Sequence, residues 1–151
     1  MALSQFPNPP LPPLPILLLD FDGVCHSYKT GWRGIDQIPD PPVPGLFEFL
    51  TQALKHFDVQ IYSSRSEDPR GVLAMKQWFS SQYNQWFRDM VESIPPDQIQ
   101  ILASDNLPLP SRLKFPTTKP PAFLTIDDRA ICFTGQWPAP EGLLKFKPWN
   151  K

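Results

Sequence analysis

The stretch "ILLLDFDGV", residues 16–24, decides how this sequence is interpreted. Its four apolar residues lead directly into two carboxylates, Asp20 and Asp22, and Gly23 follows at once. A short, continuous apolar run that ends in turn residues is typical of a strand covered on both faces. The sequence therefore predicts a buried strand over 16–19 that presents two acids at its carboxyl end.

Other apolar runs also end in polar residues. "DVQIYSS", residues 58–64, leads into Arg65, and "AFLTIDD", residues 122–128, ends in a pair of acids. A weaker run, "QIQILAS", covers 98–104. These runs predict three further strands, two of which carry chemically useful groups at their carboxyl ends.

Two amphipathic helices are predicted between these strands, within 45–57 and over 69–91, because apolar residues recur there at helical spacing. The expected core positions are Leu46, Phe49, Leu50, Ala53 and Leu54 in the first helix, and Leu73, Met75, Trp78, Phe79 and Trp86 in the second. Strands that alternate with helices indicate βαβ units. We therefore expect an α/β fold with a parallel sheet.

The composition is that of one globular domain. The 151 residues are 41% hydrophobic and 19% charged, which argues against global disorder. A net charge of −1 gives no strong nucleic-acid signal, and no apolar run approaches the roughly 20 residues that span a membrane. Two cysteines, Cys25 and Cys132, make no disulfide framework, and no signal-peptide pattern is present, so we expect a cytoplasmic protein.

The 21 prolines gather in loops and at the amino-terminal end. Residues 1–15 are expected to form a proline-rich extended arm, which could pack on the domain, stay loose, or engage a protein or oligomeric partner. Residues 16–151 then form a single domain. Within it, residues 25–44 show no periodic pattern and are expected to form a flap-like loop near the first acids.

The polar strand ends are most informative when they are taken together. In open parallel sheets the ligand site lies beyond the carboxyl ends of the strands. There, "DFDGV", "IYSSR", a lysine in "TTKPPAF" and "LTIDD" resemble motifs one to four of the haloacid dehalogenase-like (HAD) superfamily of phosphohydrolases, over residues 16–130. The resemblance implies a three-layer Rossmann-like (HAD-like) domain, with helices on both faces of a central parallel sheet. It also implies that no large cap domain is present, because the gap at 25–44 is only a loop's length.

The resemblance also implies roles for the first motif. Asp20 would be the nucleophile that attacks phosphorus and forms an aspartyl-phosphate. Asp22 would be the general acid/base, which protonates the leaving oxygen and then activates water. Gly23 would allow the backbone to approach the substrate closely.

The second and third motifs would bind the phosphoryl group. Ser63 would donate a hydrogen bond to it, and Ser64 and Arg65 would extend the same substrate-binding loop. Arg65 could equally form a salt bridge on the surface or between loops. Lys119 would offset the negative charge that builds on the reacting groups, and Lys114 is the alternative.

The fourth motif would complete a Mg²⁺ site. Asp127 and Asp128 would join the carboxylate of Asp20 and the backbone carbonyl of Asp22, since Mg²⁺ is held by few protein oxygens together with water and substrate. Which acid of the pair binds the metal directly stays open.

The expected function is that of a Mg²⁺-dependent phosphatase acting on a phosphorylated small-molecule or nucleotide-like substrate. The loop at 25–44 could bind such a ligand, or could be fixed by a buried Trp32; its candidate contacts are His26, Tyr28, Lys29, Trp32 and Arg33. The alternatives are a phosphotransferase, a phosphatase of nucleotides or nucleic-acid ends, and a catalytically silent HAD-like binding protein.

Overall fold

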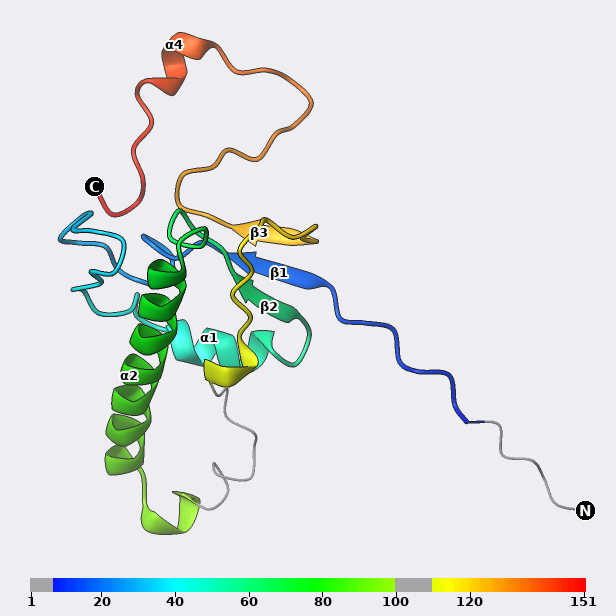
Figure 1. The fold of residues 1–151 in the computed structure, drawn as a ribbon, viewed down its shortest axis with the longest axis vertical. Coiled ribbons are helices and arrows are strands. Elements are labelled where there is room, and N and C mark those ends of the chain that lie inside the picture. Colours follow the sequence, from blue (N-terminus) through cyan, green and yellow to red (C-terminus); the bar gives the residue numbers. More distant parts are fainter. Residues whose placement is uncertain (1–6, 100–109) are drawn as a thin grey trace, which may run out of the picture.

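The computed structural model describes residues 7–99 and 110–151, and a small parallel sheet lies at its centre (Figure 1). The strands are β1 (Ile16–Leu19), β2 (Asp58–Ile61) and β3 (Leu124–Ile126), in the order β2-β1-β3. The three strands coincide with apolar runs of the sequence, and both pairings are parallel. The expectation of an α/β fold with a parallel sheet is confirmed at this level.

The register brings the carboxyl ends of all three strands to one edge of the sheet. Leu19 of β1 lies between Ile61 of β2 and Ile126 of β3. The pairing continues one residue further, because the Asp20 N–H donates to the Ile126 carbonyl at 3.0 Å. The polar residues that follow β1 and β3 are therefore adjacent in space although more than 100 positions separate them in sequence.

The helices begin where the sequence provides start signals. In α1 (Leu46–Ala53) the preceding Gly45 has φ of 89°, a conformation that glycine adopts without strain. In α2 (Pro69–Ser93) the Asp68 carboxylate accepts from the Arg70 N–H, and proline occupies the first turn. Short helical turns also occur at η1 (Pro110–Arg112) and α4 (Pro140–Leu143).

The core forms between one face of the sheet and these two long helices. Leu17 and Leu19 point to this face, where side chains of α1 and α2 pack against them. Within α1, Phe47 is buried while Phe49 is 42% exposed; within α2, Leu73 is 56% exposed. The predictions of Phe49 and Leu73 as core residues were wrong. The remaining predicted core positions are buried or packed against the core: Leu46, Leu50, Ala53, Leu54, Met75, Trp78, Phe79 and Trp86.

The layer of helices expected on the second face of the sheet stays a prediction, and so does part of the sheet itself. Of the strand expected at 98–104, residues 98 and 99 are helical, so this part of the prediction was wrong, and the rest lies outside the described residues. Beyond β2, the chain at Lys114 runs parallel to the strand, and the Ile61 N–H donates to the Lys114 carbonyl at 2.8 Å. On the side of the sheet away from β2, the outer strand β3 is exposed along its length, with Leu124 52% exposed.

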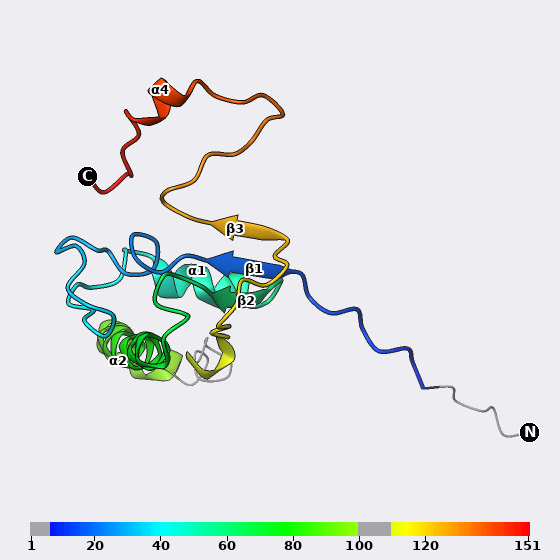
Figure 2. The ribbon, with the colours of Figure 1, turned by 45° about the horizontal axis from the view of Figure 1, so that its top comes forward.

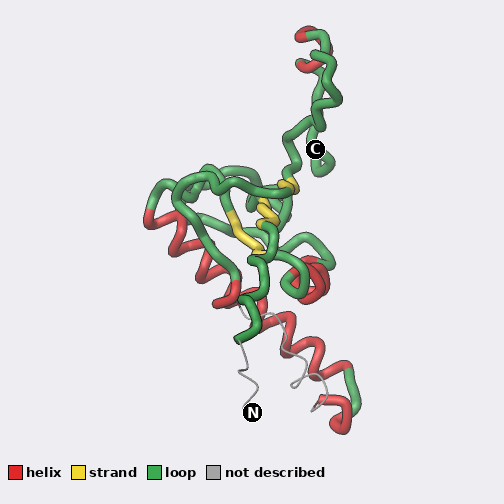
Figure 3. The backbone as a smooth tube through the Cα atoms, turned by 90° about the vertical axis from the view of Figure 1, so that its right-hand side faces the viewer, coloured by secondary structure: helices red, strands yellow, loops and turns green. Residues whose placement is uncertain are grey.

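The chain outside this core is largely irregular (Figures 2 and 3). Residues 7–15 form an extended, exposed lead into β1, and 25–44 form the expected loop. After β3, residues 129–148 stand away from the sheet in all three views. Among the described residues, no helix has the length and apolar character needed to cross a membrane.

Candidate active site

Three carboxylates converge where β1 and β3 end. Asp20 follows β1, while Asp127 and Asp128 follow β3, and one oxygen from each lies within 4.8 Å of the others. We call these residues the acid cluster. Its convergence follows directly from the parallel register of β1 and β3, so the structure brings together three of the acids that the sequence predicted for a metal site.

Asp128 is the least solvated member of the acid cluster. Its side chain is 2% exposed, and its Oδ2 has no hydrogen-bond partner in the described part of the chain. The Arg129 Nε lies 3.8 Å from this oxygen, outside hydrogen-bonding distance. The carboxylate lies against Gly23, where a Cβ atom would overlap it. A buried anionic oxygen without a donor is costly, so this arrangement favours a cation.

The surroundings of Asp20 also disfavour its negative charge. Burial, followed by the negative charges of Asp127 and Asp128, raises the pKa of Asp20 to about 7, although a hydrogen bond from the Phe21 N–H opposes the rise. The raised pKa means that the folded protein holds this carboxylate at a cost. A divalent cation bound by the three acids would remove that cost, so the donor set fits Mg²⁺ chemically.

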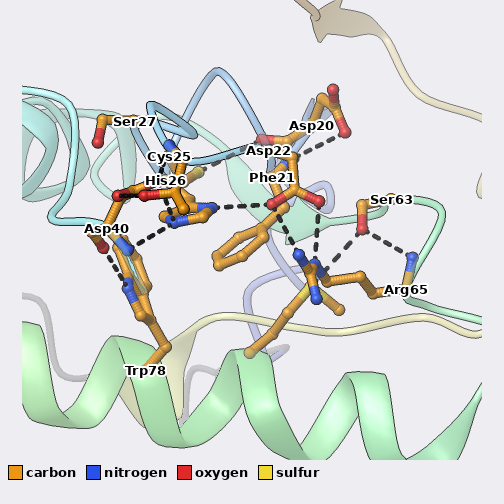
Figure 4. Close-up of polar contacts among 12 residues, drawn as sticks. Asp20, Phe21, Asp22, Cys25, His26, Ser27, Asp40, Ser63, Arg65 and Trp78 are labelled. Carbon is orange, nitrogen blue, oxygen red and sulfur yellow. Dashed lines mark hydrogen bonds and ion pairs between the residues drawn. The ribbon is translucent and has the colours of Figure 1, made fainter. Parts of the chain in front are cut away.

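The carboxylate of Asp22 points away from that of Asp20, toward His26 and Arg65 (Figure 4). Its Oδ2 accepts from Arg65 Nε at 2.9 Å, and its Oδ1 contacts Arg65 Nη2 at 3.2 Å and His26 Nδ1 at 2.9 Å. Burial raises the pKa of Asp22, but the hydrogen bonds from His26 and Arg65 outweigh it and hold the pKa below its usual value. Asp22 is therefore a carboxylate in this structure.

The hydrogen bonds of His26 fix which ring nitrogen carries the proton. The backbone N–H of Asp40 donates to His26 Nε2 at 3.0 Å, so this nitrogen must be the acceptor. The proton then sits on Nδ1, which donates to Asp22. The Asp40 carbonyl in turn accepts from the indole of Trp78 at 3.1 Å, so the network reaches from the loop to α2.

Arg65 is used entirely inside the fold. The residue is fully buried, and its Nη1 donates to the carbonyls of Gly34 and Ile35, both at 2.8 Å. Its guanidinium lies 4.5 Å from the ring centre of Trp32, which is half exposed. Of the two alternatives for Arg65, the structure has the salt bridge between loops, and the same contacts fix the loop at 25–44.

Ser63 and Ser64 form the turn that presents Arg65. The Ser63 hydroxyl accepts from the Arg65 N–H at 3.0 Å, and the Ser63 N–H donates to the Ser66 hydroxyl at 2.9 Å. Ser63 is buried and Ser64 is exposed. Because α2 starts close behind, Gly71 packs directly on the Arg65 backbone, where a Cβ would overlap the carbonyl. The Ser63 hydroxyl therefore already accepts a hydrogen bond within this turn.

The structure does not bring either candidate lysine to the acid cluster. Lys119 is exposed and precedes the amino end of β3, at the opposite edge of the sheet from Asp20. Lys114 forms an ion pair with Asp58, at the start of β2, with Nζ and Oδ2 2.8 Å apart. Lys119 therefore lies where β3 begins, and the Lys114 ammonium is paired at the start of β2, whereas the acids lie where β1 and β3 end.

His26 and Asp40 complete the buried network around Asp22. The sequence indicates His26 only as a candidate ligand contact of the loop at 25–44, and it gives no signal for Asp40. One signal was present for His26, since it follows Asp22 by four residues in a short turn. Cys25, next to it, is fully buried, and burial raises the pKa of its thiol, which suits a packing role.

Comparisons of the chain with protein-family models, curated proteins and solved structures gave no match.

Proposed function

We propose that this chain is a Mg²⁺-dependent phosphohydrolase of the HAD-like kind, which works through an aspartyl-phosphate on Asp20. The observation that carries the proposal is the acid cluster: carboxylates from the ends of two adjacent parallel strands, one of them with a buried oxygen that has no hydrogen-bond donor among the described residues. The strand order supports it, since β1 with its acids lies between the strands that carry "IYSSR" and "LTIDD".

The first chemical step would be attack by an Asp20 carboxylate oxygen on phosphorus. The bond between an Asp20 carboxylate oxygen and phosphorus forms as the bond from phosphorus to the leaving oxygen breaks, and the leaving oxygen takes up a proton from solvent water. The acid cluster would hold the metal, which supplies charge neutralisation for the phosphoryl group and the carboxylates when it is bound.

The second step would be hydrolysis of the aspartyl-phosphate. Water attacks phosphorus, its proton passes to a base, and inorganic phosphate leaves as the Asp20 carboxylate is restored. Asp22 is the proposed base, and its contacts with Arg65 and His26 keep it in the carboxylate form that accepts a proton. Because the same contacts keep Asp22 ionised, it holds no proton that it could donate in the first step.

The test is hydrolysis of p-nitrophenyl phosphate by the full chain with and without Mg²⁺. We expect turnover that requires Mg²⁺ and that Asp20→Asn abolishes. Asp89→Asn, which changes an exposed acid on α2, should leave the rate unchanged. After an acid quench, the phosphoryl group should map to Asp20. Activity that survives in Asp20→Asn contradicts the mechanism, and Mg²⁺ binding without turnover on a broad phosphate panel would favour the silent binding protein.

A further inference from the structure

Residues 129–151 connect the two sides of the candidate site. The segment leaves β3 directly after Asp127 and Asp128, and residues 129–148 stand away from the core (Figures 1 and 2). Its last residues then return to the loop that follows Asp20. The segment therefore begins next to Asp128 and ends on the loop that follows Asp20.

The return is made by specific hydrogen bonds. The indole Nε1–H of Trp149 donates to the Gly23 carbonyl at 2.8 Å, and the side-chain amide of Asn150 donates to the Ser27 carbonyl at 3.2 Å. The Lys151 ammonium lies 5.8 Å from the ring centre of Tyr28. The Trp149 residue is 63% exposed, so its ring is not held there by burial and the N–H is its specific attachment.

These contacts act on the peptide groups around Gly23. The Gly23 N–H donates to the His26 carbonyl at 2.8 Å, which fixes the peptide between Asp22 and Gly23. Trp149 fixes the next peptide through the Gly23 carbonyl. The Asp128 carboxylate rests against the Gly23 α-carbon, so movement of this glycine would change one wall of the acid cluster.

We propose that Trp149, assisted by Asn150, is a positioning residue for the acid cluster: it holds the Gly23–Ser27 loop in the conformation that receives the cation. This inference rests on the proposed function. It assigns a role to the part of the chain that the four motifs do not cover.

The contact between Asn150 and Ser27 also contains two polar atoms without hydrogen-bond partners in the described chain. Ser27 Oγ and Asn150 Oδ1 are both buried without a hydrogen-bond partner in the described chain, and they belong to the same junction. The hydroxyl can donate and the amide oxygen can accept, so the two atoms are complementary in type. If occupancy of the acid cluster tightens the loop, it strengthens this junction, and by linkage the junction strengthens occupancy.

The test compares Trp149→Phe, which keeps an aromatic ring but removes the N–H donor, with Trp137→Phe, which changes an 88% exposed tryptophan of the same segment. Hydrogen exchange measured by mass spectrometry reports on residues 20–28, and calorimetric titration with Mg²⁺ reports on the acid cluster. For the loss of one hydrogen bond we expect Trp149→Phe to speed exchange in this loop about fivefold and to weaken Mg²⁺ binding about fivefold. Trp137→Phe should match the wild type in both.

Equal exchange and equal Mg²⁺ affinity in wild type and Trp149→Phe would overturn the inference, and so would equal effects of the two substitutions. Exchange in the metal-free protein decides the positioning role even if the wild type binds no Mg²⁺. That last result would contradict the proposed function instead, so the two failures are distinguishable.

Discussion

Asp20 and Asp22 are two residues apart, yet they belong to regions of opposite character. Around Asp22, charged and polar groups are matched: a buried arginine, a histidine and backbone groups satisfy one another. Around Asp20, three carboxylates lie together, the Arg129 guanidinium stays 3.8 Å from Asp128, and Asp128 has a buried oxygen without a hydrogen-bond donor in the described residues. The difference separates a cluster whose polar groups satisfy one another from a cluster that leaves a buried carboxylate oxygen without a donor.

The region around Asp22, here called the matched region, should stabilise the folded protein. The region around Asp20, the unmatched region, should destabilise it. A buried charge with a well-placed partner leaves no unsatisfied group, whereas like charges brought together by strand register raise the free energy of the folded state.

The largest expected effect comes from Arg65→Met, which leaves the buried Asp22 carboxylate without its cation. Breaking a buried ion pair of this kind costs about 3–5 kcal/mol in the free energy of unfolding, measurable by urea denaturation. Arg70→Met, which breaks the exposed pair with Asp68, is the control and should leave the unfolding midpoint unchanged. Equal midpoints for wild type and Arg65→Met would show that the matched region does not support the fold.

The second prediction concerns the pH dependence of the metal-free protein. Folding raises the pKa of Asp20 from 3.8 to about 7, so between these pH values the folded protein holds a proton that the unfolded chain has lost. The free energy of unfolding should therefore fall as the pH rises through this window, by on the order of 2–4 kcal/mol from this group. Asp20→Asn should lose this component, as urea titrations across the window would show.

The pKa of Asp22 is lowered, so its contribution has the opposite sign. It is present above the ordinary pKa of an aspartate and is lost as the pH falls below it. The two acids thus act in separate pH windows. A decline between pH 4 and 7 that persists in Asp20→Asn would contradict the assignment.

A smaller effect on stability is expected from Gly23→Ala, paired with Gly31→Ala. Both glycines have a positive φ, 87° and 79°, so each alanine should cost about 1–2 kcal/mol of stability. A Cβ at Gly31 meets nothing within 4 Å, whereas one at Gly23 overlaps the Asp128 carboxylate. Only Gly23→Ala should therefore also weaken Mg²⁺ binding in a calorimetric titration. Equal Mg²⁺ affinities would place the cation elsewhere.

The smallest effect is expected from Lys119→Ala. Because Lys119 precedes the amino end of β3, we expect p-nitrophenyl phosphate turnover within about twofold of the wild type, well short of the losses that follow removal of a group stabilising transition-state charge. A hundredfold loss would show that this lysine reaches the acid cluster during turnover.

The sequence was sufficient for the parts of the fold that depend on local pattern. Apolar runs located the strands, and because parallel strands end at one edge, Asp20, Asp127 and Asp128 could be placed together before any coordinates were known. The environment of Asp22 was not predictable in this way. Its partners come from a turn after β2 and from a loop without periodicity, so only tertiary packing brings Arg65 and the Asp40–His26 contact together.

The structure does not place Lys119 beside the acid cluster, for a related reason. The expectation for Lys119 rested on residue type and order along the chain, which do not report the edge of the sheet at which a residue lies. The core positions Phe49 and Leu73 failed because helical spacing identifies a face of a helix but not its limits.

The position of β3 has a consequence for the order in which the molecule assembles. β1, α1 and β2 form from neighbouring segments, whereas more than 100 residues separate β3 from β1 along the chain. The exposed strand β3 also buries little surface when it pairs. We expect β3 to dock last and to detach first. A cation shared by Asp20 and the acids after β3 would tether that strand, so metal addition should slow its opening while leaving the exchange of β2 unchanged.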